Sequence, residues 1–338
     1  MRTLLPFKRP LAHAFHYYAF PLGILAEHPE AEDWVLSNYI HVVANEAAPL
    51  PFTFQIYDYS ISPWLEVLRL NREWCTAHDD ITKIVRDAVS LNFYVYLTLN
   101  ERYVPERIAY QGQTDYAHDI LIRGVDDQKD TFDIVGYDYQ QMFRCTDLPQ
   151  EDLFTAYHNT GPDPFYDVPL TMYRYNPLGS YRFDIGFIAR SIGEYLESYD
   201  ISRHFQGLRG PEGGVHGMES YGLLEHYLDS YGRGMIEYDI RRLQVLWEHK
   251  RLMVARMRRC ADFVPDVGDL MTAYQRVERL AWTLRTMMIA HGTGHASGDF
   301  QTEAKTVLDD IRTTEQNVLA ALVICLEAAL QRGGGLHK

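Results

Sequence analysis

Three runs of alternating residues between positions 92 and 138 constrain the fold of this 338-residue chain more than any other feature. In the first run, residues 93–99, apolar residues alternate with Tyr94, Tyr96 and Thr98. This pattern predicts a β-strand with one face on a core, because successive side chains of a strand point to opposite faces. The runs at 118–124 and 131–137 flank an acidic turn and predict a hairpin.

The two ends of this hairpin carry a histidine and a carboxylate. His118 opens the second run, and Asp138 follows the third. In an antiparallel hairpin these positions lie at the same end of the ladder, so the two side chains can meet. A histidine oriented by a carboxylate is the general-base pair of a catalytic triad. The sequence therefore predicts His118 as a catalytic base and Asp138 as the residue that orients it.

This layout, which ends in Gly136-Tyr137-Asp138, resembles the butirosin biosynthesis protein H family within the papain-like amidohydrolase and acyltransferase group. The resemblance covers roughly residues 85–140 and is looser over the helical remainder. It implies an α+β fold with a papain-like antiparallel sheet core. It also implies a cysteine acyltransferase of antibiotic biosynthesis, including nonribosomal peptide assembly, which moves an acyl group from a carrier-protein thioester to a small-molecule amine.

The resemblance departs from the family at the nucleophile. Where the family has an early His-Cys pair opening a helix, this chain has His16-Tyr17, and no cysteine precedes Cys75. The resemblance places Tyr17 in the catalytic position near His118, with His16, Tyr94 and Tyr116 as substrate-binding residues. A phenol with a pKa near 10 is a poor substitute for a thiolate. The amine itself could instead be deprotonated by His118 and attack the thioester directly.

Three functions therefore stay open. The first is an accessory protein of antibiotic biosynthesis that acts as an acyltransferase on carrier-bound substrates. The second is a catalytically inactive family member that serves as a carrier-protein-binding scaffold. The third is a hydrolase with an unrecognised serine or cysteine nucleophile, for which Cys75 is the fallback because it is the only cysteine before His118.

Charge and composition exclude several other classes. The formal net charge of −14 argues against binding of nucleic acid or of anionic membranes, which need a basic surface. The four cysteines are far apart and show no metal-binding spacing. His291 and His295 are four residues apart, but the intervening glycines end the predicted helix, and no metal or cofactor is expected. The apolar run at 318–330 is too short for a membrane span, and we expect a cytoplasmic protein.

The chain is predicted to have two parts, an acyltransferase-type domain at 1–176 and an α-helical domain at 177–338. Pro21 and Pro29 confine any helix before residue 33 to the piece between them. Residues 140–176, rich in Pro, Asp, Gly and Tyr, predict a long surface connection. Periodicity predicts further strands at 34–43, 52–59 and 170–175, and helices at 64–75, 81–91, 149–158, 185–196, 223–231, 238–261, 269–291 and 302–332.

A basic segment stands out in the helical part. Residues 241–259 hold seven lysines and arginines against the single acid Glu248. An apolar stripe on the same helix predicts that Arg242, Lys250 and Arg256 point outward. We expect this face to dock an acidic acyl or peptidyl carrier protein, because complementary charge accelerates association.

Overall fold

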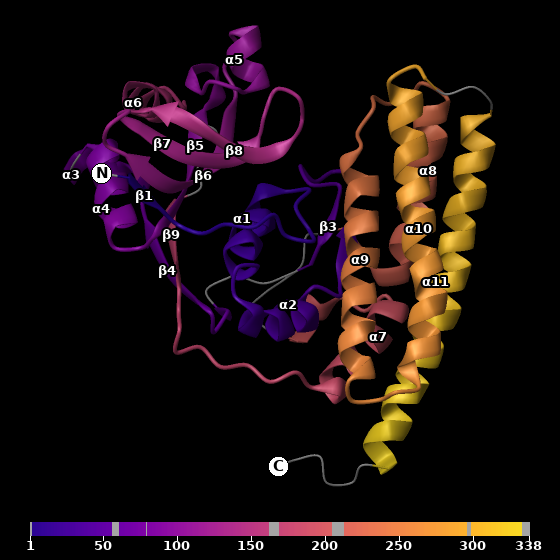
Figure 1. Cartoon of the computed structure of the whole chain (residues 1–338). Helices are drawn as coiled ribbons and strands as arrows, with labels where there is room; N and C mark the ends of the chain where they lie inside the picture. Colours follow the sequence, from indigo (N-terminus) through magenta and orange to yellow (C-terminus); the bar gives the residue numbers. More distant parts are fainter. Residues whose placement is uncertain are drawn as a thin grey trace. The chain divides into compact units, whose positions relative to one another are not determined.

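The computed structural model describes residues 2–55, 61–78, 80–161, 169–204, 213–295 and 299–332. It confirms the α+β class, with a seven-stranded antiparallel sheet and a helical C-terminal part (Figure 1). The chain divides into two compact units. The sheet unit comprises Met1–Glu32 and Asp58–Tyr181, and the helical unit comprises Asp33–Tyr57 and Arg182–Lys338. The predicted division at 176–177 lies near the second crossing, whereas the prediction assigned 33–57 to the first domain.

The large sheet has the strand order β4-β9-β5-β6-β7-β8, and β1 pairs with the far end of β6. Every pairing is antiparallel. The strands are β1 (Arg2–Leu4), β4 (Leu65–Leu70), β5 (Tyr94–Asn100), β6 (Ala117–Asp126), β7 (Thr131–Tyr137), β8 (Phe143–Pro149) and β9 (Leu170–Tyr175). The three strands predicted from alternation are β5, β6 and β7, and the predicted last strand is β9.

Helices of the sheet unit cover both faces of this sheet. The helices are α1 (His16–Leu25), α3 (Arg72–His78), α4 (Ile81–Ser90), α5 (Ile108–Gly112) and α6 (Gln150–His158). Apolar residues of α4 and α6 form one core with Val95, Leu97 and Leu99 of β5. The alternate residues of β5 face the other way, where Tyr96 meets Phe20 of α1 at a ring distance of 5.5 Å. Alternation in β5 therefore separates an apolar core from a layer of polar and aromatic residues.

Three predictions in this unit were wrong. Residues 65–70 of the helix predicted at 64–75 form strand β4, and α3 begins at Arg72, because pairing with β9 outweighs the helical spacing of the apolar residues. The segment 143–149 is an edge strand, whose exposed polar residues concealed it in the sequence. Helix α1 continues through Pro21. The helices α4 and α6 confirm the predictions at 81–91 and 149–158, and Asp80 caps α4 by accepting from Thr82 N.

The helical unit is built on long helices that run side by side (Figure 1). They are α7 (Ile185–Leu196), α8 (Ser220–Gly232), α9 (Arg241–Ala261), α10 (Val267–Gly292) and α11 (Phe300–Arg332), and all five were predicted. A small sheet has the order β10-β2-β3, from β10 (Val215–His216), β2 (Val42–Ala44) and β3 (Phe52–Phe54). The strand predicted at 34–43 was wrong, because α2 (Glu32–Asn38) precedes β2. The end of the strand predicted at 52–59 lies outside the described residues.

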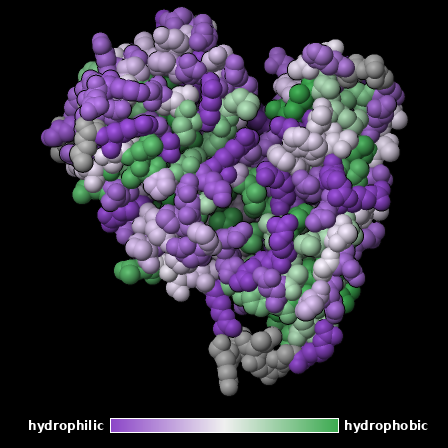
Figure 2. Space-filling view, in the orientation of Figure 1, coloured by the Kyte–Doolittle hydropathy of each residue, from purple (hydrophilic) through white to green (hydrophobic). Residues whose placement is uncertain are grey.

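Helix α11 is, among the described residues, the one helix whose length and composition would allow a membrane span. Only 28% of its most apolar window is buried. A long helix of a bundle meets the same criteria, and α11 contacts α7, α8 and α10. Figure 2 shows polar and apolar residues mixed along this part of the helical unit. The exposed charged residues of α11 are Glu303, Asp309, Asp310, Arg312, Glu327 and Arg332.

Candidate active site

Two histidines from distant parts of the sequence meet in the sheet unit. His16 is the first residue of α1, and His118 lies near the start of β6. Their ring centroids are 4.7 Å apart. The Nδ1 atom of His16 lies 2.9 Å from the backbone oxygen of Asp119, so helix α1 is tied to β6 at this point.

The carboxylate that orients His118 is Glu101, in the 3₁₀ turn that follows β5 (Glu101–Tyr103). Glu101 Oε1 lies 2.9 Å from His118 Nδ1, and the Glu101 side chain is buried. The other ring nitrogen, Nε2, lies 3.5 Å from Asp119 Oδ1. The side chain of His118 is 26% exposed, so a substrate can reach it. His118 and Glu101 therefore form a histidine–carboxylate pair.

Asp138 does not take the role predicted for it. The register of Leu121 with Val135 does place Asp138 opposite His118 when it is continued along the ladder. The carboxylate nevertheless turns away and accepts hydrogen bonds from the backbone of Gln140 and Met142, at 2.8 and 2.9 Å. It also pairs with Arg144. Asp138 therefore closes the turn between β7 and β8, where two backbone N–H groups and the Arg144 cation hold its carboxylate.

Asp119 is a second carboxylate in the cluster, and sequence reasoning missed it. Its Oδ2 accepts a hydrogen bond of 2.7 Å from the hydroxyl of Tyr96, and its Oδ1 lies 3.4 Å from His16 Nδ1. Burial alone would raise the pKa of Asp119, but the charge and hydrogen bond of His16 and the charge of His118 hold the pKa well below its usual range. The signal in the sequence was an acid directly after His118 in an otherwise apolar strand.

The environments of the two histidines shift their pKa values in opposite directions. Burial lowers the pKa of His16, and the charge of Asp119 offsets this only in part. Burial also acts to lower the pKa of His118, but the hydrogen bond to Glu101 and the charge of Asp119 outweigh it and raise the pKa. Neighbouring titratable groups with separated pKa values are typical of sites that move protons.

His16 has a buried nitrogen without a hydrogen-bond partner. Its Nδ1 faces Asp119, whereas its Nε2 is buried and makes no hydrogen bond. The ring stacks on Phe20 at 4.6 Å and on Tyr137 at 5.5 Å, and these rings fix its orientation. A Cβ atom at Gly136 would lie 3.5 Å from His16 Cε1 and 3.0 Å from Arg107 Nη2. Gly136 thus gives the imidazole and the guanidinium room to approach the sheet.

Arg107 is a buried cation at the edge of the cluster. Its side chain is 1% exposed, and its Nε lies 3.6 Å from Glu101 Oε1. Burial lowers the pKa of Arg107, although Glu101, Asp138 and Glu106 act to raise it. The Nε and Nη2 atoms make no hydrogen bond. Arg107 therefore balances part of the negative charge of the carboxylates without consuming their hydrogen-bonding capacity.

The other predicted site residues divide between the cluster and its surroundings. Tyr116 lies 5.3 Å from His118 by ring centroids and is 45% exposed, at the open side of the cluster. Tyr94 bonds to the carbonyl of Pro6, and its neighbour on the same face of the strand, Tyr96, reaches Asp119 instead.

Tyr17 does not lie against His118. Among the described residues, the aromatic rings against His118 are those of His16 and Tyr116. The rings in contact with Tyr17 include those of Phe15 and Tyr18. The imidazole of His16 therefore lies beside His118, where Tyr17 was predicted.

None of the four cysteines is an activated thiol. Cys75 and Cys260 are buried, Cys145 is exposed, and Cys325 is intermediate. Burial raises the pKa of all four thiols, to about 12 for Cys260. Cys75, the fallback nucleophile, belongs to the apolar core beneath β5. A reactive cysteine needs the opposite shift, towards a stable thiolate.

The predicted docking face on α9 was wrong for two of its three residues, because α9 is a central helix of its unit. Lys250 is 1% exposed and donates to both carboxylate oxygens of Glu315, at 2.8 and 2.7 Å. Arg256 is fully buried and donates to the backbone oxygens of Leu36 and Tyr39. Neither side chain is available to a partner.

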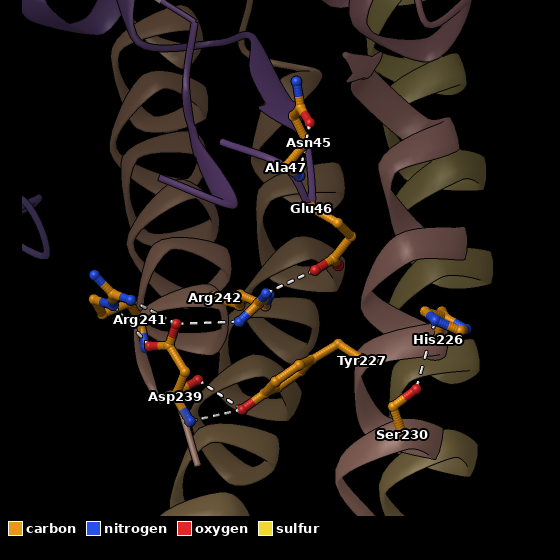
Figure 3. A network of polar contacts seen from close by, with 9 residues as sticks. All are labelled: Asn45, Glu46, Ala47, His226, Tyr227, Ser230, Asp239, Arg241 and Arg242. Carbon is orange, nitrogen blue, oxygen red and sulfur yellow. Dashed lines mark hydrogen bonds and ion pairs between the residues drawn. The ribbon is translucent and has the colours of Figure 1, made fainter. Parts of the chain in front are cut away.

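Arg242 lies nearer the surface but is engaged within the unit (Figure 3). It donates to Glu46 at 2.8 Å and to Asp239 at 3.1 Å, and its guanidinium lies 4.3 Å from the centre of the Tyr227 ring. Only 11% of its side chain is exposed. The basic helix therefore provides internal ion pairs where the sequence predicted a docking surface.

Comparison with protein-family models and curated proteins identified no relative of this chain. The chain matches no protein-family model, and no curated protein matches it. The resemblance to the butirosin biosynthesis protein H family therefore remains a prediction.

Proposed function

We propose that the sheet unit transfers an acyl group from a thioester to an amine, with His118 as general base and without a covalent acyl-enzyme intermediate. The observation that carries this proposal is the contact of 2.9 Å between His118 Nδ1 and the buried Glu101. A carboxylate at Nδ1 fixes the tautomer that carries its proton there, and it leaves the lone pair of Nε2 free to accept another. The resemblance supplies the substrate class.

The reaction needs no further reactant. As the amine nitrogen attacks the thioester carbonyl carbon, its proton passes to His118 Nε2, and Glu101 stabilises the imidazolium that forms. The carbon–sulfur bond then breaks, and the leaving thiolate takes the proton from His118. The amide and the free thiol are the products, and His118 returns to its starting state.

The direct route is favoured by the side chains around His118. Its ring neighbours among the described residues are His16 and Tyr116, and all four thiols have raised pKa values. A double-displacement mechanism requires an activated nucleophile beside the base. A thioester is reactive enough for an amine to attack it directly once the amine has lost its proton. The acyl donor in this proposal is carried on the thiol of an acyl or peptidyl carrier protein, as the resemblance implies.

The test is aminolysis of a simple acyl-pantetheine thioester by a panel of small amines, followed by the release of free thiol. His118→Gln should lower the rate by about 10²- to 10⁴-fold, the usual contribution of a general base. Glu101→Gln should give a smaller loss, because it keeps the shape of the orienting side chain and removes its charge. His158→Gln, at an exposed histidine of α6, is the matched control.

The outcomes separate the three candidate functions. Loss of amide formation in His118→Gln with unchanged thermal stability supports the proposal. Equal rates of amide formation in His118→Gln and the unmodified protein would contradict it, and the absence of amide formation in both would favour a scaffold. Release of free acid at a rate independent of the amine would instead identify a hydrolase.

A further inference from the structure

We infer that His16, His118 and Asp119 form a binding site for one divalent transition-metal ion of the zinc type. One ligand atom from each of these side chains lies within 4.8 Å of the other two. Two imidazoles and one carboxylate are a ligand set that zinc sites with three protein ligands use. This inference is independent of the proposed function, because binding of the ion is measured without turnover.

His16 has the tautomer that a metal ligand needs. Its Nδ1 lies 2.9 Å from a backbone carbonyl oxygen, which can only accept, so the proton of the neutral ring is on Nδ1. The lone pair is then on Nε2, which is buried and has no hydrogen-bond partner. A buried acceptor without a partner is costly to the fold. A cation at this atom would satisfy it.

His118 also has one ring nitrogen held by a neighbouring oxygen atom. Its Nδ1 is engaged by Glu101, and its Nε2 lies 3.5 Å from Asp119 Oδ1. Histidines that bind metals almost always donate their other ring N–H to a carboxylate or a backbone carbonyl. Here His118 has the carboxylate and His16 has the carbonyl. The sequence positions of the two histidines gave no sign of this pairing.

Asp119 completes the set with one oxygen. Its Oδ2 is held by the hydroxyl of Tyr96 at 2.7 Å. Its Oδ1 lies 3.4 Å from His16 Nδ1 and 3.5 Å from His118 Nε2. Neighbours hold one atom of each side chain: the Asp119 carbonyl holds His16 Nδ1, Glu101 holds His118 Nδ1, and Tyr96 holds Asp119 Oδ2.

The surroundings favour a cation of higher charge than a proton. Asp119 and Glu101 are both carboxylates, and Arg107 is the cation closest to Glu101, at 3.6 Å. The rings of Phe20 and Tyr137 hold His16 in place before any ion arrives. A rigid ligand set loses little entropy on binding. With three protein ligands, a fourth position stays open for water or substrate on the exposed side of His118.

Metal binding and base catalysis both use the lone pair of His118 Nε2. The two states therefore exclude one another, and the metal-free form is the one to which the proposed function applies. Imidazole ligands suit zinc, copper, iron and nickel, so zinc is a suitable probe. Cobalt is the second probe. Cobalt reports its own coordination through its visible absorption.

The experiment uses the full chain, treated with a chelator and dialysed, and titrated with Co²⁺ and then with Zn²⁺. We expect one Co²⁺ per chain with the absorption of a four- or five-coordinate site, displaced by one Zn²⁺. His16→Ala and Asp119→Asn should each weaken Zn²⁺ binding by roughly 100-fold or more, because each removes a direct ligand. Glu101→Gln should weaken it by about 10- to 100-fold, as outer partners of metal-bound histidines do.

Two controls keep the result interpretable. Circular dichroism of each variant shows whether it is folded, and Asp119→Asn preserves the shape of the side chain. His291→Ala combined with His295→Ala removes the other close histidine pair and should leave Zn²⁺ affinity unchanged. Absence of Co²⁺ binding, or binding that survives His16→Ala and Asp119→Asn but not the paired control, would overturn the inference.

Activity assays then separate this inference from the proposed function. Aminolysis that persists in excess chelator, together with tight Zn²⁺ binding, supports both, and the ion is then an inhibitor of the base. Aminolysis that needs His118 in a chain that binds no Zn²⁺ overturns the metal site alone. Zn²⁺ binding in a chain without aminolysis overturns the proposed function alone.

Discussion

Each unit of this protein contains a buried cluster of charged and polar side chains. The two clusters differ in whether their buried polar atoms all have hydrogen-bond partners. In the helical unit, Glu315 is fully buried and accepts from Lys250 through both oxygens. It also accepts from three buried tyrosine hydroxyls, those of Tyr195, Tyr221 and Tyr274. In the sheet unit, by contrast, His16 Nε2 and Arg107 Nη2 are buried without a hydrogen-bond partner.

The comparison suggests how to separate a cluster that maintains the fold from one that binds something. A saturated network has no capacity for a ligand, so the Lys250–Glu315 cluster serves to link α9 to α11. A cluster with unused acceptors and donors is costly by itself and is retained where a ligand or a reaction uses them.

The largest effect should follow from Lys250→Met. The substitution removes the cation and leaves the Glu315 carboxylate buried without its charge partner, which costs about 3–5 kcal/mol of the free energy of unfolding. Chemical denaturation of the full chain measures this loss. Arg258→Ala, at an exposed position of the same helix, is the control and should change stability by less than about 0.5 kcal/mol.

A double variant sharpens this test. Lys250→Met with Glu315→Leu removes both charges, and it should be more stable than Lys250→Met alone because no uncompensated charge remains. If Lys250→Met alone were as stable as the unmodified protein, the cluster would not hold the bundle together.

Acid should affect the helical unit through His41. Burial, followed by the charges of Arg256, His204 and His216, lowers the pKa of His41 to about 3. His249 also faces it, and Glu194 lies 3.9 Å away. The unfolded chain, with an ordinary pKa of about 6.5, therefore binds more protons below neutrality than the folded one.

Stability from this group is complete above about pH 6.5 and is lost as the pH falls towards 3. We expect a loss of about 2 kcal/mol between pH 7 and pH 5. His41→Gln should flatten this part of a plot of unfolding free energy against pH. An unchanged slope in His41→Gln would assign the acid sensitivity to other groups.

A smaller effect is expected for His16→Phe in the sheet unit. The substitution keeps the stack on Phe20 and removes the unpartnered Nε2, but it also removes the contact with the Asp119 carbonyl. The two changes oppose one another, so stability should change by about 1 kcal/mol or less, whereas Zn²⁺ binding should be abolished. A loss as large as that of Lys250→Met would make His16 a structural residue and remove the contrast.

The smallest effect is expected from alkylation of thiols. Cys145 is exposed and should react with iodoacetamide, while burial protects Cys75 and Cys260. Labelling followed by peptide mass spectrometry should show a modified Cys145 together with unchanged aminolysis. Inactivation that parallels the labelling of any cysteine would restore a covalent mechanism.

Local pattern predicted the central strands, whereas the partners of the charged residues were beyond it. Alternation identified β5, β6 and β7 because each residue's face depends only on its immediate neighbours. It also placed Asp138 opposite His118. The 3₁₀ turn at Glu101 and the donors that bind Asp138 decide which carboxylate contacts the His118 imidazole. Neither feature has a signature in the sequence.

The same limit explains the error at α9. Seven cations over residues 241–259 have the pattern of a solvated helix face. No local feature of the sequence indicates that Lys250 forms an ion pair with Glu315, 65 residues later. A buried lysine is rare without such a partner. Helical periodicity located α9 correctly and still could not show that neighbouring elements enclose it on most sides.

The route of the chain between the two units bears on its synthesis. The segment Asp33–Tyr57 belongs to the helical unit, and its strands β2 and β3 are buried against β10, α8 and α9. On the ribosome, the sheet unit is complete once Tyr181 has emerged, but this apolar segment must wait until α9 has been made. A chaperone that binds short apolar strands would be expected to hold residues 33–57 during that interval. A fragment that ends at Tyr181 should aggregate unless this segment is replaced by a short polar linker.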